Sequence, residues 1–139
     1  MARLDRARLD AACFSCSIEL PTRYADLDPQ KHVNNSAATV LLQEARIQFD
    51  FTAGVILDLY RFVTASLWVE YADEMFFPEQ VTVSTGILEF GRSSFTLGQI
   101  ARQRGRPTLY AETVMVVADA SGPAPMPPDM RARYEPFLL

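Results

Sequence analysis

The sequence is poor in the residues that metal sites, disulfide frameworks and membrane anchors require. Its 139 residues include two cysteines and one histidine, which are too few ligands for a structural zinc site. No apolar run approaches the roughly 18 residues of a membrane span. The basic stretch over residues 1–8 is not followed by the apolar segment of a signal peptide. We therefore expect a cytoplasmic protein with no metal, no cofactor and no membrane partner.

Positive charge is scarce as well. Thirteen Lys and Arg stand against 17 Asp and Glu, which gives a net charge of −4. Nucleic-acid-binding proteins usually present a basic face, so no nucleic-acid partner is expected. Apolar residues make up 49% of the chain, enough for the core of one domain. We predict an N-terminal arm over residues 1–13, disordered or fraying, and a single domain over residues 14–139.

The two cysteines, Cys13 and Cys16, have the spacing of a redox or metal-binding pair. On a strand, residues three apart point to opposite faces of the sheet. Opposite faces suit neither a disulfide nor shared ligation of a metal. We interpret both cysteines as small apolar residues.

The apolar pattern predicts one long helix followed by antiparallel strands. Residues 35–53 form the predicted helix, and Gly54 is either a stop signal or the start of a looser turn. Strands are predicted over residues 14–23, 66–71, 81–90, 94–102 and 109–119, with turns at residues 91–93 and 104–107. A Pro-rich segment follows residue 121, and a short helix is predicted over residues 129–134. This order is typical of an α+β fold in which an antiparallel sheet wraps around one central helix.

The predicted helix carries two apolar stripes, whereas a surface helix normally carries one. A sheet curled around the helix would cover both stripes and leave Gln43, Arg46 and Asp50 facing solvent, with Glu44 between the stripes. A small sheet of this kind has exposed edges that a second copy can cover, so we expect at least a homodimer, or a homotetramer. The stripes are Ala38, Leu41, Leu42, Ala45 and Phe49 on one side, and Val40, Ile47 and Phe51 on the other.

The junction between the first predicted strand and the helix concentrates polar chemistry. Residues 24–35 hold two carboxylates, the single histidine and two asparagines. Asn34 or Asn35 can cap the helix, whose first N–H groups and dipole attract negative charge. A carboxylate beside such an anion-stabilising helix start can cleave an acyl bond. Asp26 and Asp28 are also ordinary turn residues, whose side chains bond to their own backbone.

This junction resembles that of the hot-dog-fold acyl-CoA thioesterases of the 4-hydroxybenzoyl-CoA thioesterase type, and it is similar to the acyl-ACP thioesterases that share the fold. The likeness extends over roughly residues 14–135, because the turn at residues 91–95 and the terminal Pro127-Pro128-Asp129 also match the usual layout. The residues that carry the resemblance are Asp26, Asp28, His32, Val33, Asn34 and Asn35, with Glu44, Ala45 and Arg46 on the helix.

The resemblance implies a thioester hydrolase that acts on an acyl-CoA, or on an acyl carrier protein. Asp28 would attack the thioester carbonyl or activate water, two roles that the sequence does not separate. His32 would act beside it, and the backbone N–H groups of Val33, Asn34 and Asn35 would form the oxyanion hole. On the hairpin, Arg92 would contact CoA phosphates together with Ser93 and Ser94. The basic cluster expected there is only partly preserved, since Gly91 and Ser93 replace two of its members.

Some residues depart from the family pattern. Pro29-Gln30-Lys31 precedes the histidine where many relatives have a small residue, and Ala38 and Leu41 occupy helix positions that are usually aromatic. If those two positions line the acyl site, the pocket is wider than usual. A non-catalytic acyl-thioester-binding protein is the alternative function. A hot-dog dehydratase and a serine hydrolase are disfavoured, because the dehydratase-type Gly-Asp-x-Asn-Pro-x-His run and the Gly-x-Ser-x-Gly elbow are missing.

Overall fold

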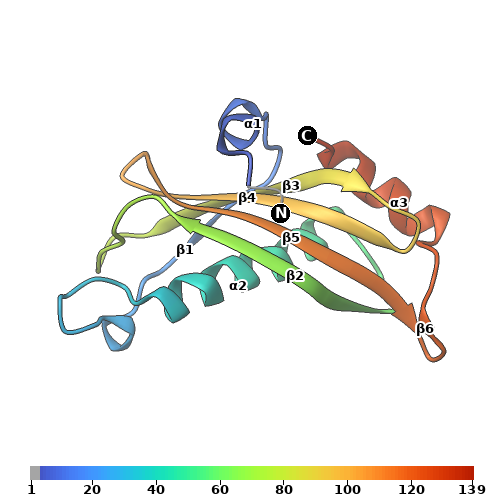
Figure 1. The fold of residues 1–139 in the computed structure, drawn as a ribbon, viewed down its shortest axis with the longest axis horizontal. Coiled ribbons are helices and arrows are strands. Elements are labelled where there is room, and N and C mark those ends of the chain that lie inside the picture. Colours follow the sequence, from blue (N-terminus) through green and yellow to red (C-terminus); the bar gives the residue numbers. More distant parts are fainter. Residues whose placement is uncertain (1–3) are drawn as a thin grey trace.

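One antiparallel sheet curves around a long helix in the computed structural model, which describes residues 4–139. The helix α2 (Asn35–Ala53) lies against one face of the sheet, and the short α1 (Arg6–Ala11) lies against the opposite face (Figure 1). The helix α3 (Pro128–Tyr134) follows the last strand, and its Tyr134 stacks on Phe49 of α2 with ring centroids 5.8 Å apart. The predicted α+β arrangement is confirmed.

The strand order is β1-β3-β4-β5-β2, with β6 paired to β5. Every pairing between these strands is antiparallel. The predicted strands exist, although the first is shorter than expected and the second begins earlier. Two short 3₁₀ helices, Tyr24–Asp26 and Glu135–Phe137, complete the fold. The strands are β1 (Ser17–Leu20), β2 (Arg61–Tyr71), β3 (Val81–Phe90), β4 (Ser94–Gln103), β5 (Arg106–Asp119) and β6 (Gly122–Pro123).

Local signals at both ends fix the bounds of α2. The Asn34 side chain accepts a hydrogen bond from the Ala37 N–H at 2.8 Å, which satisfies one unpaired donor of the first turn. Gly54 ends the helix with φ +73°, a left-handed conformation that glycine adopts without strain, and its N–H bonds to the carbonyls of Asp50 and Phe51. The predicted helix and its stop signal are confirmed.

Only one apolar stripe of α2 is covered. Ala38, Leu42, Ala45 and Phe49 are buried against the sheet. The second stripe is open, because Val40, Ile47 and Phe51 are 60%, 44% and 79% exposed. The prediction that the sheet would cover both stripes is wrong, since it wraps only one side of the helix.

The prediction for the polar side of α2 is wrong at two positions. Arg46 is buried and Asp50 is half-buried, because both face the strands, and the Arg46 Nη1 donates to the Gln99 Oε1 of β4 at 3.2 Å. Gln43 is exposed as predicted. Glu44, placed between the stripes, is also exposed, and its carboxylate accepts a hydrogen bond from Gln48 at 3.0 Å. A sequence pattern gives the faces of a helix but does not show how far a sheet reaches around it.

The N-terminal segment is ordered over α1, so the predicted disorder or fraying is wrong there. Asp5 caps this helix, and Leu9 is fully buried on the outer face of the sheet with Leu88 and Ile100. A side chain at Gly98 would meet Leu9 at 2.6 Å, so the close approach of α1 requires a glycine in β4. Residues 1–3 of the predicted arm lie outside the described residues.

The two cysteines have separate environments. Cys16 packs in the core near Phe49, as its interpretation as an apolar residue predicts, while Cys13 is exposed, and neither takes part in a disulfide. Within residues 4–139, no helix is long and apolar enough to cross a membrane.

The two edges of the sheet differ. The edge strand β1 is only four residues long, whereas β2 at the other edge has 11 residues. On β2, the side chains of Val63, Leu67 and Tyr71 are exposed. In the described chain one side of β2 pairs with β5 and the other pairs with no strand. A long edge strand with apolar side chains is the type of edge that other strands pair with.

Candidate active site

The loop between β1 and α2 is held in shape by Asn34. The Asn34 backbone N–H and the side-chain Nδ2 both donate to the Asp26 carbonyl at 2.9 Å, while its Oδ1 caps α2. Lys31 turns the loop with φ +68°. Because all of these Asn34 contacts are structural, its side chain is a cap and a brace for the residues that it flanks.

Asp28 presents one carboxylate oxygen to the loop and one away from it. Its Oδ1 accepts backbone N–H bonds from Gln30 at 2.9 Å and His32 at 3.1 Å. These bonds confirm the turn interpretation and fix the carboxylate in place. Among the described residues, no hydrogen-bond donor reaches Oδ2. One oxygen of Asp28 is therefore available to another molecule.

A cavity of about 660 Å³ lies beside this loop and the first turn of α2. Asp28, His32 and Asn35 line its polar side, and Ala38 and Leu109 are among its apolar lining. Ala38 thus borders the same space as the predicted catalytic carboxylate. Leu41 is not part of its lining.

Few N–H groups at the start of α2 remain unbonded. The Val33 N–H donates to the Met75 carbonyl at 2.8 Å, and the Asn34 N–H donates to Asp26. In the single chain, neither N–H group is free to donate a hydrogen bond to a substrate oxygen. The N–H groups of Asn35 and Ser36 find no acceptor within residues 4–139. Of the three predicted oxyanion donors, only Asn35 is open, and the sequence analysis missed Ser36.

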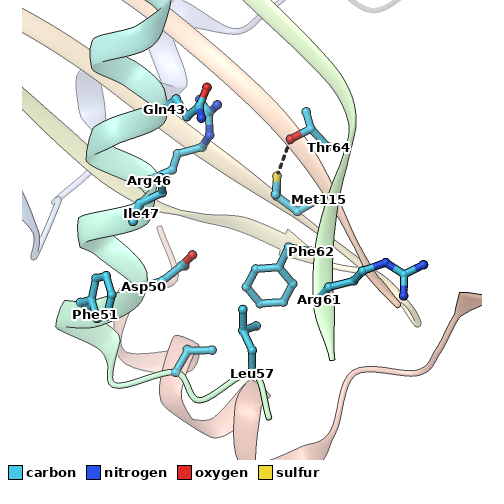
Figure 2. Close-up of a pocket in the computed structure, with 11 residues that line it drawn as sticks. Gln43, Arg46, Ile47, Asp50, Phe51, Leu57, Arg61, Phe62, Thr64 and Met115 are labelled. Atoms are coloured by element: carbon cyan, nitrogen blue, oxygen red, sulfur yellow. Dashed lines mark hydrogen bonds between the residues drawn. The ribbon is translucent and has the colours of Figure 1, made fainter. Parts of the chain in front are cut away.

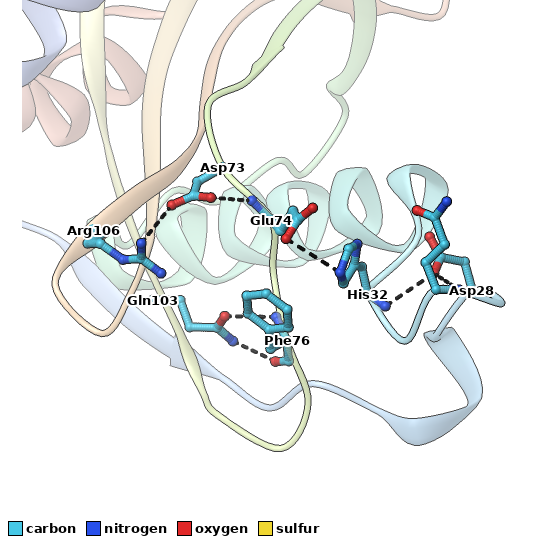
Figure 3. A network of polar contacts seen from close by, with 8 residues as sticks. Asp28, His32, Asp73, Glu74, Phe76, Gln103 and Arg106 are labelled. Carbon is cyan, nitrogen blue, oxygen red and sulfur yellow. Dashed lines mark hydrogen bonds and ion pairs between the residues drawn. The ribbon is translucent and has the colours of Figure 1, made fainter.

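Glu74 is a second residue that the sequence analysis missed. Its Oε2 lies 3.4 Å from the His32 Nε2, and the His32 ring meets the Phe76 ring edge-on at 5.2 Å (Figure 3). Both His32 and Glu74 line the cavity. No local motif marks Glu74, because the contact joins two loops that are distant in the chain.

The segment that carries Glu74 is clamped on both sides of that residue. The Gln103 side chain accepts from the Phe76 N–H at 2.8 Å and donates to the Phe76 carbonyl at 2.7 Å. Asp73 pairs with Arg106 at 3.1 Å (Figure 3). These contacts from the β4–β5 hairpin hold Glu74 in front of His32.

Asp26 has a different role from Asp28. Its two oxygens accept from Arg23 at 2.8 and 3.0 Å, and it does not line the cavity. The hydrogen bond and charge of Arg23 lower the pKa of Asp26. Asp26 is therefore a turn residue and serves as a matched comparison for Asp28.

The predicted phosphate-binding residues lie far from Asp28 in one chain. Arg92, Ser93 and Ser94 are at the β3–β4 turn, whereas Asp28 precedes α2 at the opposite end of the sheet (Figure 1). The ten residues of β3 span about 33 Å at 3.3 Å per residue. One chain does not bring these two predicted groups together.

One protein-family model matches the part of the chain that carries these features. The model described as the thioesterase-like superfamily matches residues 22–134, which include the loop, the cavity and the whole sheet apart from β1. The chain belongs to this superfamily. Residues 4–139 of this superfamily member bring together no group of three His, Cys, Asp or Glu side chains able to hold a metal ion.

Solved structures of thioesterases are similar to this superfamily member. A predicted thioesterase from Bacillus stearothermophilus is 25% identical, with 88% of this chain and 96% of that chain covered and a TM-score of 0.81. A thioesterase from Thermus thermophilus, complexed with coenzyme A and Zn, is 28% identical over 88% of this chain and 99% of that chain, with a TM-score of 0.81.

A DHNA-CoA thioesterase from Staphylococcus aureus shares the fold at 18% identity, with 86% and 88% of the two chains covered and a TM-score of 0.76. No curated protein matches the chain significantly. The hot-dog fold and the thioesterase family are confirmed, and the chain is a thioester hydrolase by family.

Proposed function

We propose that this superfamily member is an acyl-CoA thioesterase that releases a free acid and CoA. One observation carries the proposal: the open oxygen of Asp28 and the unbonded N–H of Asn35 belong to residues that border the same cavity. The relative from Thermus thermophilus, complexed with coenzyme A, favours CoA over a carrier protein as the thiol.

Asp28 supplies the attack in this proposal. Its carboxylate either adds to the thioester carbonyl, forming a mixed anhydride that water then opens, or takes a proton from a water that adds instead. In both routes the carbonyl oxygen becomes negative, and the C–S bond then breaks to release the thiolate of CoA. The N–H groups of Asn35 and Ser36 face that negative charge at the start of α2, where each such donor is worth about 3–4 kcal/mol.

His32 completes the site as a proton donor to the leaving thiolate. Glu74 and Phe76 fix the orientation of its ring at the rim of the cavity. A thiolate is a good leaving group, so this proton transfer assists the reaction less than the attack by Asp28 does. Glu74 is a positioning residue that acts through His32.

We further propose that two copies pair through β2. The open edge of β2 and the exposed stripe of α2 lie along one side of the molecule, where Val63, Leu67 and Ile47 offer apolar surface. Antiparallel pairing of β2 with its own copy sets the Tyr71 end of one strand against the Arg61 end of the other.

This pairing brings the two predicted groups to the same place. Tyr71 lines the cavity of Asp28, and the β3–β4 turn lies at the Arg61 end of the sheet. Arg92 of a second copy then lies on the same side as the free carboxylate oxygen of Asp28 in the first copy. An exposed guanidinium on that turn can bind a CoA phosphate through charge-assisted hydrogen bonds.

The first test is release of thiol by the purified protein. A thiol-reactive dye should report turnover of at least one member of an acyl-CoA panel of varied chain length and aromatic content. The same acyl groups on an acyl carrier protein should react more slowly. Binding of the acyl-CoAs in calorimetry without any release of thiol would contradict hydrolysis and favour the non-catalytic binding protein.

A further inference from the structure

The loop between α2 and β2, residues 54–60, presents an apolar surface to solvent. Ile56, Leu57 and Leu59 are 74%, 39% and 82% exposed. Phe51, in the last turn of α2, is 79% exposed. Single exposed apolar side chains are ordinary on a protein surface, whereas several close together in the chain mark a contact site. We therefore expect another molecule to cover this loop.

The backbone of the loop is fixed at both ends. Val55 and Tyr60 pack against the core cluster that contains Tyr134. The Val55 N–H donates to the Asp50 carbonyl at 3.1 Å, and the Tyr60 N–H donates to the Leu57 carbonyl at 2.8 Å. Because the backbone is already ordered, a contact made by its apolar side chains costs little further entropy.

The inner side of the loop borders a second cavity, of about 650 Å³, between α2 and the strands β2 and β5 (Figure 2). Leu57 and Phe62 line this cavity near the start of β2, and Met115 of β5 is a further apolar wall. Ile56 and Leu59 are not part of its lining. Leu57 thus faces the chain's own cavity, while Ile56 and Leu59 remain for contact with another molecule.

The proposed antiparallel pairing of two β2 strands decides where this loop lies. The residues before Arg61 of the second copy run alongside the residues after Tyr71 of the first copy, because paired antiparallel strands lie about 4.8 Å apart and run in opposite directions. Residues 72–74 of the first copy line the cavity of Asp28. The loop of one copy therefore reaches the Asp28 cavity of the other.

The rim of the Asp28 cavity suits this approach in exposure and in charge. Tyr71, Asp73 and Glu74 are exposed, so this side of the cavity is open to solvent in one chain. The described residues that line it include three carboxylates and no Lys or Arg. The approaching end of β2 carries Arg61, whose exposed guanidinium is attracted by these carboxylates.

A second copy is a better occupant than a membrane surface. Residues 50–60 contain no Lys or Arg, and the chain has a net charge of −4. Surfaces that bind membranes usually combine apolar side chains with basic ones, which attract anionic lipid headgroups.

From these positions we infer that residues 56–59 of a second copy close the open side of the Asp28 cavity. Leu59 covers the mouth, and Leu57 forms an apolar wall where this cavity meets the one in Figure 2. The inference rests on the proposed pairing and hydrolysis and deepens them. The loop displaces bulk water from the thioester, which strengthens the attraction between its developing negative charge and the N–H groups of α2.

Chemical cross-linking tests the contact. With Leu59→Cys and Ala72→Cys in one chain that also carries Cys13→Ser, a short bismaleimide should double the mass of the chain on a denaturing gel. Cys16 is buried and does not compete. Within one chain, the 11 residues of β2 separate the two positions by about 36 Å at 3.3 Å per residue, so only a link between copies can form.

The matched control for the cross-link is Leu59→Cys with Gln80→Cys. Gln80 is exposed and precedes β3, which lies three strands away from β2 in the sheet. This variant should keep the mass of a single chain.

Binding tests the closure without turnover. Leu57→Ser together with Leu59→Ser should weaken binding of a non-hydrolysable acyl-CoA thioether by roughly tenfold in calorimetry, because the ligand loses apolar contact. Glu44→Gln alters an exposed carboxylate outside both cavities and should bind like wild type.

The outcomes separate this inference from hydrolysis. A single-chain mass for the Leu59→Cys and Ala72→Cys protein, with thiol release intact, would overturn the contact and leave hydrolysis standing. Cross-linking and weakened thioether binding without thiol release would support the closure and contradict hydrolysis. Unchanged thioether binding in the serine variant would overturn the closure. Flotation of wild type with phosphatidylglycerol vesicles, lost in the serine variant, would assign the loop to a lipid surface and overturn it as well.

Discussion

Replacing Asp28 by asparagine should lower kcat for acyl-CoA hydrolysis by roughly 10³-fold or more. The amide can still accept the N–H bonds of Gln30 and His32 through its oxygen, so the loop keeps its shape. It cannot add to a carbonyl as a carboxylate does, nor take a proton from water. Steady-state release of thiol, with circular dichroism to confirm folding, measures the effect.

Asp26→Asn is the matched control, two residues away in the same loop. Asp26 bonds to Arg23 and does not line the cavity, so this variant should stay within a few-fold of the wild-type rate. An Asp28→Asn variant with undiminished turnover would remove Asp28 from the reaction. An equal loss in both variants would show that the loop, and not the carboxylate, is what matters.

Asp50→Asn should make the protein more stable at neutral and alkaline pH. Burial raises the pKa of Asp50 from its ordinary value of 3.8 to about 6, although the Tyr134 hydrogen bond and the charge of Arg46 act in the opposite direction. The folded protein therefore opposes ionisation of this group. The difference of 6 − 3.8, or 2.2, corresponds to about 3 kcal/mol above pH 6.

The sign follows from where the proton sits. Between pH 3.8 and 6 the folded state keeps the proton of Asp50 while the unfolded state has lost it, so stability falls as pH rises through this window. Below pH 3.8 the penalty is absent. Urea unfolding of wild type and variant at pH 4 and pH 8 measures the change, and the advantage of Asp50→Asn should appear only at the higher pH.

Glu44→Gln is the control, because its exposed carboxylate should leave the pH dependence of stability unchanged. An Asp50→Asn variant that is less stable than wild type at pH 8 would contradict the account, since the carboxylate would then be a net stabilising group. A half-buried carboxylate that destabilises the fold is typical of residues kept for function.

The sequence predicts features whose signals are local. Asn34 and Gly54 mark the two ends of α2 through contacts within one helical turn, so the helix could be predicted closely. The β3–β4 and β4–β5 hairpins follow from turn residues between alternating strands. The packing of α1 depends on Leu9 meeting Gly98, a contact between distant parts of the chain that no local pattern announces.

The candidate site divides in the same way. Asp28 and Asn35 lie close together in the chain, and their place before and inside the first turn of α2 could be predicted. Two other features join different loops, so only the structure reveals them. They are the hydrogen bond that the Val33 N–H donates to the Met75 carbonyl, and the contact of Glu74 with His32. The burial of Arg46 also depends on a distant partner, Gln99 of β4.

The central claim is that Asp28 of one copy and Arg92 of a second copy act on the same thioester. It is tested by the activity of a heterodimer purified through two tags, with Asp28→Asn in one chain and Arg92→Glu in the other. One of its two sites keeps both residues, so kcat/KM should recover to about half of the wild-type value, far above both parent homodimers.

The control heterodimer pairs a wild-type chain with a chain that carries both substitutions, and it should have no intact site. The opposite pattern would contradict a site shared between copies. In that case the control heterodimer would keep about half of the wild-type activity, and the first heterodimer would keep only half of the activity of the Arg92→Glu parent.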